Sequence, residues 1–245
     1  MRLVALALAG LLAGCAATPK PTAAMNPAAS APAFDPALVV PIVAWPAEKP
    51  VPLSSEPGAA AGDGEPGAVL RQVAAPWSAA DGDIAPLLAR MHATLLSSGG
   101  VGIAAPQIGV AKRVFLVKHG TRRQASEPAG KPPYIVAYVN PQVIWASPER
   151  LEDYEACLSV KGVGGELPRA LRLRIRYQAA DDLWGPPREV QASDWDARIF
   201  AHELDHIDGH LYIDHLAALS RPLLSIDEMR RLRDLRHRER GLVAP

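Results

Sequence analysis

The 245-residue chain is poor in cysteine and in aromatic side chains: it has only two cysteines, Cys15 and Cys157, and aromatics make up 5% of its residues. Two cysteines allow at most one disulfide, which excludes a small scaffold held by several bridges. Lys and Arg together number 26, as do Asp and Glu, so the chain lacks the basic excess of a nucleic-acid-binding protein. We therefore expect a globular domain with no nucleic-acid partner.

The N-terminus has the features of an export signal. Arg2 precedes a short apolar run, residues 3–13, which is too short for a membrane-spanning helix. The run ends in Leu12-Ala13-Gly14-Cys15, which resembles a bacterial lipobox, where the chain is cut before a cysteine that carries lipid. This predicts a lipoprotein signal over residues 1–15 and a membrane anchor on Cys15. The alternative is an ordinary secretory signal with an incidental cysteine.

The location of the chain follows from the lipobox. By resemblance to Gram-negative lipoproteins, Ala16 after the cysteine favours the outer membrane, with the protein facing the periplasm. If Cys15 carries lipid, Cys157 has no disulfide partner, and its thiol needs another explanation.

The remaining sequence divides into a tether and one domain. Residues 16–37 are rich in Ala and Pro and predict a disordered tether. Residues 38–240 predict one domain, with a flexible insertion over residues 47–68. Apolar spacing predicts a helix over 84–99, strands over 113–118, 134–140 and 170–178, a helix from Ser193 to Gly209 and a last helix over 225–240. Strands and helices without a βαβ rhythm predict an α+β fold.

The stretch Ala201–Gly209, AHELDHIDG, predicts a metal site. His202 and His206 stand four residues apart, so both imidazoles leave one face of a helix. Glu203 beside them suits a base that acts on water rather than a ligand. In a catalytic site with tetrahedral geometry, three positions are held by protein ligands and the fourth by water, so two histidines leave one protein ligand to be found. A metalloprotease would take that ligand from after the helix, where Asp208, His210, Asp214 and His215 are available, whereas the thiolate of Cys157 is the other candidate.

Three motifs in order make the chain resemble the peptide deformylases. They are GxGxAAxQ at Gly100–Gln107, ExCLS at Glu155–Ser159 and HExDH at His202–His206, and the likeness spans residues 38–216. The resemblance implies a deformylase-like α+β fold, with mixed and antiparallel sheets around a central metal-binding helix. It also implies a metal-dependent hydrolase that removes the N-formyl group from N-formylmethionyl peptides and releases formate.

The resemblance also implies a role for each site residue. Cys157, His202 and His206 are the expected ligands of one Zn²⁺ or Fe²⁺ ion, and Glu203 is the expected general base. The side-chain amide of Gln107 and the backbone N–H of Leu158 are expected to stabilise the oxyanion. Gly100, Gly102 and Ile103 are expected to pair with the peptide substrate as an added strand. We expect a monomer.

Two positions depart from the family pattern, and two other functions stay open. Ala156 stands where the family has Gly, and Ala201 where it has Gln. One alternative is an envelope zinc metallopeptidase. The other is a non-catalytic lipoprotein that binds formyl-peptides or metal.

Three further residues near the motifs receive weaker assignments. Trp195 is equally suited to a methionine pocket and to the core. Glu155 is assigned to supporting its loop, and Asp205 to orienting a histidine or pairing with an Arg.

Overall fold

The computed structural model describes residues 34–50, 53, 67–121 and 134–241, all of them within the unit Ala31–Pro245. Cys15, the lipobox, most of the tether and most of the 47–68 insertion therefore lie outside the described residues. In the part of the chain that is described, no helix has both the length and the apolar character needed to cross a membrane.

Two antiparallel sheets make up the β-structure. The first has five strands in the order β1-β2-β3-β6-β7, namely Gly102–Ala104, Val114–His119, Tyr134–Ala146, Arg172–Ala179 and Arg188–Ser193. The second has three, β4-β5-β8, namely Arg150–Cys157, Val160–Ala170 and Leu224–Ser225. All named pairs are antiparallel, so the predicted α+β class is confirmed.

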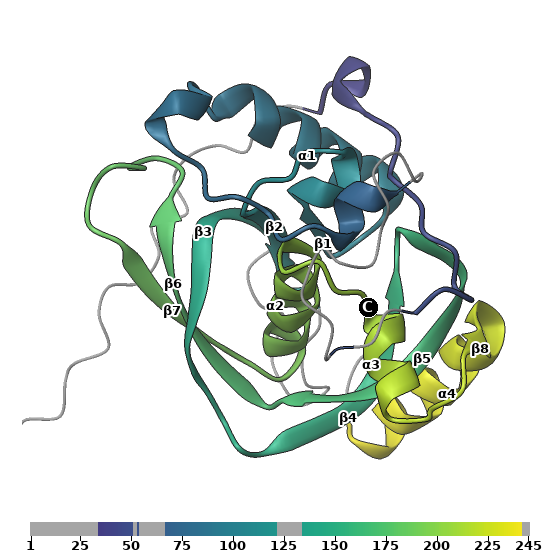
Figure 1. The fold of residues 1–245 in the computed structure, drawn as a ribbon. Coiled ribbons are helices and arrows are strands. Elements are labelled where there is room, and N and C mark those ends of the chain that lie inside the picture. Colours follow the sequence, from purple (N-terminus) through teal and green to yellow (C-terminus); the bar gives the residue numbers. More distant parts are fainter. Residues whose placement is uncertain (1–33, 51–52, 54–66, 122–133, 242–245) are drawn as a thin grey trace, which may run out of the picture. The chain divides into compact units, whose positions relative to one another are not determined.

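Helix α2 occupies the centre of this arrangement, with strands of both sheets around it (Figure 1). The helices are α1 (Ala85–Ser98), α2 (Asp194–Ile207), α3 (Tyr212–Ala218) and α4 (Ile226–Glu239). Short 3-10 helices lie at η1 (Pro36–Leu38), η2 (Ala68–Arg71), η3 (Ala79–Asp81) and η4 (Ala105–Ile108). Helices α3 and α4 pack against β4 and β5.

Local sequence patterns predict several of these elements well. Helix α1 buries Leu87, Met91 and Leu95, and ends where Gly99 takes the left-handed conformation at φ 70°. Strand β6 alternates as predicted, with Ile175 buried and Arg174 exposed. Ser193 and Asp196, three residues apart at the start of α2, have the spacing that predicts a capping box, and this prediction is wrong. Ser193 makes no side-chain cap bond, and the carboxylate of Asp196, its expected partner, lies 2.7 Å from Nδ1 of His119.

The segment VKGVGGELP, residues 160–168, reads as turns in the sequence but forms most of β5. Glycine in a strand usually weakens it, unless another part of the chain approaches closely. Here a Cβ on Gly164 would lie 2.2 Å from Sδ of Met229, and one on Gly165 would lie 2.4 Å from Cδ1 of Leu216. The two glycines therefore let side chains of α3 and α4 pack directly on the strand.

Candidate metal centre

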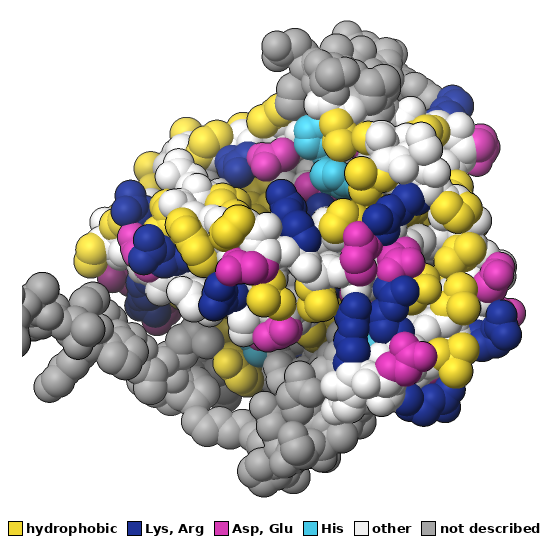
Figure 2. Space-filling view, turned by 90° about the horizontal axis from the view of Figure 1, so that it is seen from below, with side chains coloured by type: hydrophobic (Ala, Val, Ile, Leu, Met, Phe, Trp, Pro, Cys, Tyr) yellow, Lys and Arg dark blue, Asp and Glu magenta, His cyan; other side chains and the backbone are white. Residues whose placement is uncertain are grey.

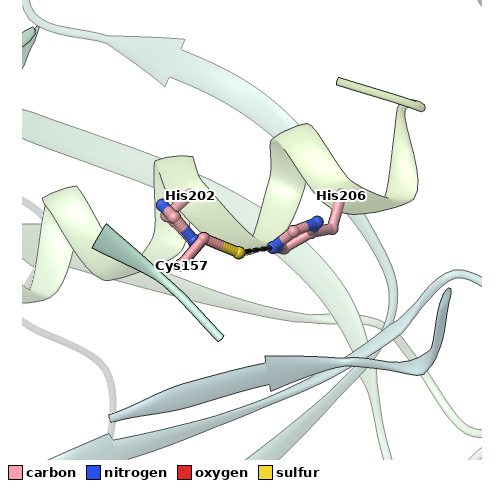
Figure 3. Close-up of side chains that lie close together, drawn as sticks. All are labelled: Cys157, His202 and His206. Atoms are coloured by element: carbon pink, nitrogen blue, oxygen red, sulfur yellow. Dashed lines mark hydrogen bonds between the residues drawn. The ribbon is translucent and has the colours of Figure 1, made fainter. Parts of the chain in front are cut away.

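The two histidines of α2 meet the end of β4. Donor atoms of Cys157, His202 and His206 all lie within 4.8 Å of one another, and Figure 3 shows the thiol between the two rings. Sγ of Cys157 is 3.2 Å from Nε2 of His206. Within the described ranges this is the one group of three such side chains with metal-binding geometry. The structure thus brings together the three predicted ligands.

Three of the four other candidate ligands are engaged elsewhere, and the fourth, His210, is not among the grouped donor atoms. Asp208 pairs with Arg113 at 2.6 Å, and Asp214 pairs with Arg71 at 2.6 Å. Nε2 of His215 lies 2.9 Å from a carboxylate oxygen of Asp205. The ligand set expected of a metalloprotease is therefore not assembled around His202 and His206.

The electrostatics of the cluster favour a thiolate. Burial alone would raise the pKa of Cys157, but the imidazoles of His206 and His202 lower it well below its ordinary value. Burial likewise lowers the pKa of His202, yet Cys157 and Glu155 together raise it well above the usual range. A buried anionic sulfur beside two imidazole nitrogens is a donor set that suits a divalent ion such as zinc or iron. The residues present therefore fit the implied metal.

Glu203 is buried next to the cluster, with 3% of its surface exposed. Its Oε2 has no hydrogen-bond partner among the described residues. Burial raises the pKa of Glu203 to about 7, although the two histidines oppose this. A carboxylate with a pKa close to neutrality and a free oxygen is suited to accept and return a proton.

Gln107 is held in one orientation. Its Oε1 accepts the backbone N–H of Ala104 at 2.9 Å, so the amide nitrogen must point the other way. That nitrogen lies 3.2 Å from Oγ of Ser159 and 3.7 Å from Sγ of Cys157. Leu158 is half-buried between these two residues in the chain. A side-chain amide donor therefore faces the cluster.

Strand β1 borders the site as an edge strand. It pairs with β2 on one side, with Gly102 opposite Val117, and stands at the end of the five-stranded sheet. A Cβ on Gly102 would lie 2.3 Å from Oε1 of Glu203, so this glycine makes room for the carboxylate. The side chain of Ile103 is fully buried in the core beneath α1, and Gly100 is half-buried near Leu158. In the part of the chain that the structure describes, no strand pairs with the outer edge of β1.

Sequence reasoning missed how the carboxylate of Glu155 is used. The assignment to loop support is incomplete, because Glu155 lies on strand β4 and its Oε2 is also 3.0 Å from Nδ1 of His202. Arg169 donates to both oxygens of Glu155, at 2.8 and 2.9 Å, and Arg198 donates to Oε1 at 2.7 Å. Glu155 is two residues from Cys157 on one strand, and this alternation was the available signal.

For Asp205 and for Trp195, the structure favours one of the two roles that the sequence left open. Asp205 pairs with Arg169 at 2.8 Å, which supports its salt-bridge alternative. Trp195 packs on the core cluster of Phe200 and donates to Oγ1 of Thr121 at 3.1 Å, which favours its core role.

The two family departures do not disturb the backbone. Ala156 is exposed beside the cluster, and the described non-glycine residues with positive φ are Asn140, Asp194 and Ser220. Ala156 therefore needs no glycine-like conformation. Ala201 is half-buried and packs on the same core as Trp195.

Comparison with known proteins agrees with this geometry. The family model for polypeptide deformylase matches residues 61–222. The peptide deformylase of Bartonella bacilliformis is 36% identical over 160 residues, which cover 65% of this chain and 85% of that protein. The peptide deformylase of Thermotoga neapolitana is 35% identical, covering 71% and 94%. The Met-Ala-Ser-bound crystal structure of a class I type b peptide deformylase from Acinetobacter baumannii is 32% identical with a TM-score of 0.55, covering 72% and 98%. The chain belongs to the polypeptide deformylase family.

Proposed function

We propose that this chain is a peptide deformylase of the bacterial cell envelope, with Cys157, His202 and His206 as the ligands of its single metal ion. As a member of its family, the enzyme hydrolyses the N-formyl amide of N-formylmethionyl peptides and yields formate and a free amine. The observation that carries the ligand assignment is the cluster of three donor atoms within 4.8 Å.

The chemistry can be assigned residue by residue. A bound divalent ion supplies Lewis acidity toward water and the formyl oxygen. Glu203 accepts a proton from the attacking water and returns it to the nitrogen as the C–N bond breaks. The amide of Gln107 and the backbone N–H of Leu158 donate to the oxyanion of the tetrahedral intermediate. Each such donor contributes about 2.7–4 kcal/mol of barrier lowering.

The substrate is proposed to bind along β1. Because β1 is an edge strand, an extended peptide can add to it through backbone hydrogen bonds near Gly100, Gly102 and Ile103. The related Acinetobacter baumannii enzyme has been solved with Met-Ala-Ser bound. We take a formylated peptide of that kind as the probe substrate.

The resident metal is proposed to be Zn²⁺, with Fe²⁺ as the alternative. Both ions accept a thiolate and two imidazoles. Outside the cytosol, iron(II) bound to a thiolate is prone to oxidation, which favours zinc in an exported enzyme.

The location rests on the lipobox at Cys15, in a part of the chain that the structure does not describe. A lipid on Cys15 would hold the enzyme at the outer membrane, facing the periplasm, as a monomer joined to its anchor by the Ala/Pro-rich residues 16–37. There it would meet formylated peptides that leave the cell. No nucleic-acid partner is proposed, and on the face seen in Figure 2 side chains of both charges are interspersed.

The two alternatives lack support. A metallopeptidase ligand set is not assembled, since Asp208 and Asp214 pair with arginines. A purely binding role would not require the buried Glu203 with its raised pKa.

The first experiment measures formate released from formyl-Met-Ala-Ser by the full chain, with bound metal quantified in the same sample. Glu203→Ala should lower turnover by about 10²–10⁴-fold while metal content is retained. The control is Glu189→Ala, which removes an exposed carboxylate paired with Arg176. Wild-type turnover by Glu203→Ala would refute the assigned base. No formate from a fully metallated chain would refute the deformylase itself.

The anchor is tested separately with a radioactive fatty acid fed to cells. The wild-type chain should take up label and Cys15→Ser should not. Equal labelling and processing of the two would show that Cys15 carries no lipid.

A further inference from the structure

Arg198 is a buried cation one helical turn before His202 on α2. Only 2% of its surface is exposed. Its Nη1 donates to Oε1 of Glu155 at 2.7 Å. A buried charge is costly unless it is paired, so the position of this side chain is defined by its acceptors.

The same guanidinium joins three elements. Its Nη2 donates to the carbonyl of Leu151 on β4 and to that of Leu167 on β5, the latter at 3.0 Å. Strand β4 ends at Cys157, whereas α2 carries His202 and His206. Arg198 therefore ties the helix that carries two proposed ligands to the hairpin that carries the third.

Arg198 also balances the charge around Glu155. Arg169 is shared between two carboxylates, because it pairs with Glu155 at 2.8 Å and with Asp205 at 2.8 Å. Asp153, fully buried on β4, adds a further negative charge that interacts with Arg198. Without Arg198, one guanidinium would serve both Glu155 and Asp205, and Oε1 of Glu155 would lose one of its two donors.

We infer that Arg198 is a positioning residue for the metal centre, which fixes Glu155 against Nδ1 of His202 and locks α2 onto the β4–β5 hairpin. The inference rests on the proposed ligand set, but not on the identity of the substrate. It treats Arg198 as a residue that acts through Glu155 and the backbone and does not touch the reacting atoms.

The test compares metal binding in three variants of the full chain. Arg198→Met removes the charge and all its donors. Arg198→Lys keeps the charge but cannot reach the carboxylate and both carbonyls together. Arg221→Met is the matched control, because Arg221 donates to Glu152 on β4 and to the carbonyl of Glu166 on β5. No hydrogen bond or ion pair in the described residues joins Arg221 to Glu155.

Zinc affinity is measured by chelator competition, and the visible spectrum is recorded with Co²⁺ in place of zinc. Loss of the hydrogen-bond partner that orients a metal-ligating side chain typically lowers the metal affinity about 10–100-fold. Arg198→Met should show that loss and an altered Co²⁺ spectrum, Arg198→Lys an intermediate affinity, and Arg221→Met wild-type values. A spectral change separates repositioned ligands from a general loss of stability.

Wild-type affinity and spectrum in Arg198→Met would overturn the inference. If that variant does not fold, Arg198→Lys decides, and wild-type metal binding in it would overturn the inference equally. Because no substrate is used, a chain that binds metal but releases no formate would refute the proposed function without affecting this result. A wild-type chain that binds no metal would refute both.

Discussion

Nδ1 of His202 donates to Oε2 of Glu155 over 3.0 Å, and this bond determines which ring nitrogen faces Cys157. A carboxylate can only accept, so a proton is held at Nδ1 and Nε2 is the nitrogen that a metal ion can bind. Burial would raise the pKa of Glu155, but Arg169, His202 and Arg198 together lower it well below its usual range. The acceptor therefore stays ionised at neutral pH.

Glu155→Gln should weaken metal binding by about 10–100-fold. An amide can satisfy His202 only by turning its NH₂ group toward the guanidiniums of Arg169 and Arg198. The free energy of unfolding should also fall, by about 3 kcal/mol, because two buried cations each lose one charged partner. Chelator competition and urea unfolding measure the two effects. Glu166→Gln, on the same hairpin, is the control, and equal metal affinity in the two variants would contradict the role of Glu155.

Gln107→Ala should lower kcat by about 10²–10³-fold, with KM and metal content little changed. The amide is already oriented by Ala104, so its donor is in place before substrate binds. Steady-state kinetics with formyl-Met-Ala-Ser measure the effect. Ser159→Ala removes only the hydroxyl beside the amide and should have a smaller effect. A kcat within twofold of wild type in Gln107→Ala would exclude the amide from oxyanion stabilisation.

Gly102→Ala should lower kcat/KM by about 100-fold, the cost of displacing a catalytic group by roughly 1 Å. The new methyl group would lie 2.3 Å from Oε1 of Glu203 and 3.0 Å from Cγ2 of Ile199. At Gly100 the nearest atoms are 3.0 Å away at the tip of Leu158 and 3.3 Å away at the tip of Leu95, which can yield. Gly100→Ala should therefore lower kcat/KM less than Gly102→Ala does. A larger loss of kcat/KM in Gly100→Ala would show that these glycines make room for the substrate and not for Glu203.

Asp205→Asn tests a pH-dependent part of stability. Burial raises the pKa of Asp205, but Arg169 and His215 outweigh it and lower the pKa from 3.8 to about 2. A depressed carboxyl pKa stabilises the fold above the unfolded pKa, and that stability is lost as the pH falls through the folded pKa. The contribution is about 2 kcal/mol, present above pH ~4 and lost between pH ~4 and ~2.

The measurement is the difference in unfolding free energy between the wild-type chain and Asp205→Asn at pH 5, 3.5 and 2.5. The difference should shrink as the pH falls. Asp227→Asn, whose wild-type side chain is 98% exposed, should show no such trend. A difference for Asp205→Asn that stays constant with pH would mean that its carboxyl is not linked to folding in this way.

Features set by neighbours in the chain were predictable from the sequence. The i, i+4 spacing of His202 and His206 places both rings on one helix face, and the apolar spacing of Leu87, Met91 and Leu95 defines α1. The lipid on Cys15 stays a prediction.

Features set by tertiary packing were not predictable. The glycine-rich sequence of β5 is typical of turns. The strand is explained only by the packing of Met229 and Leu216 against its glycines. Likewise, nothing in the sequence around Arg198 indicates that it pairs with Glu155, which lies 43 residues away in the chain. A sequence pattern carries no information about which distant side chain will lie opposite.

The three donor atoms come from two different elements of the fold, and this affects the stability of the fold. Cys157 lies at the end of a strand and the histidines on a helix, so an ion held by all three would act as a cross-link between two parts of the fold. The segment between Cys157 and His202 would close a loop of about 45 residues, for which chain entropy alone gives about 4 kcal/mol. The ion would thus serve the domain as a staple, a role that Cys157, the one cysteine among the described residues, cannot fill as a disulfide.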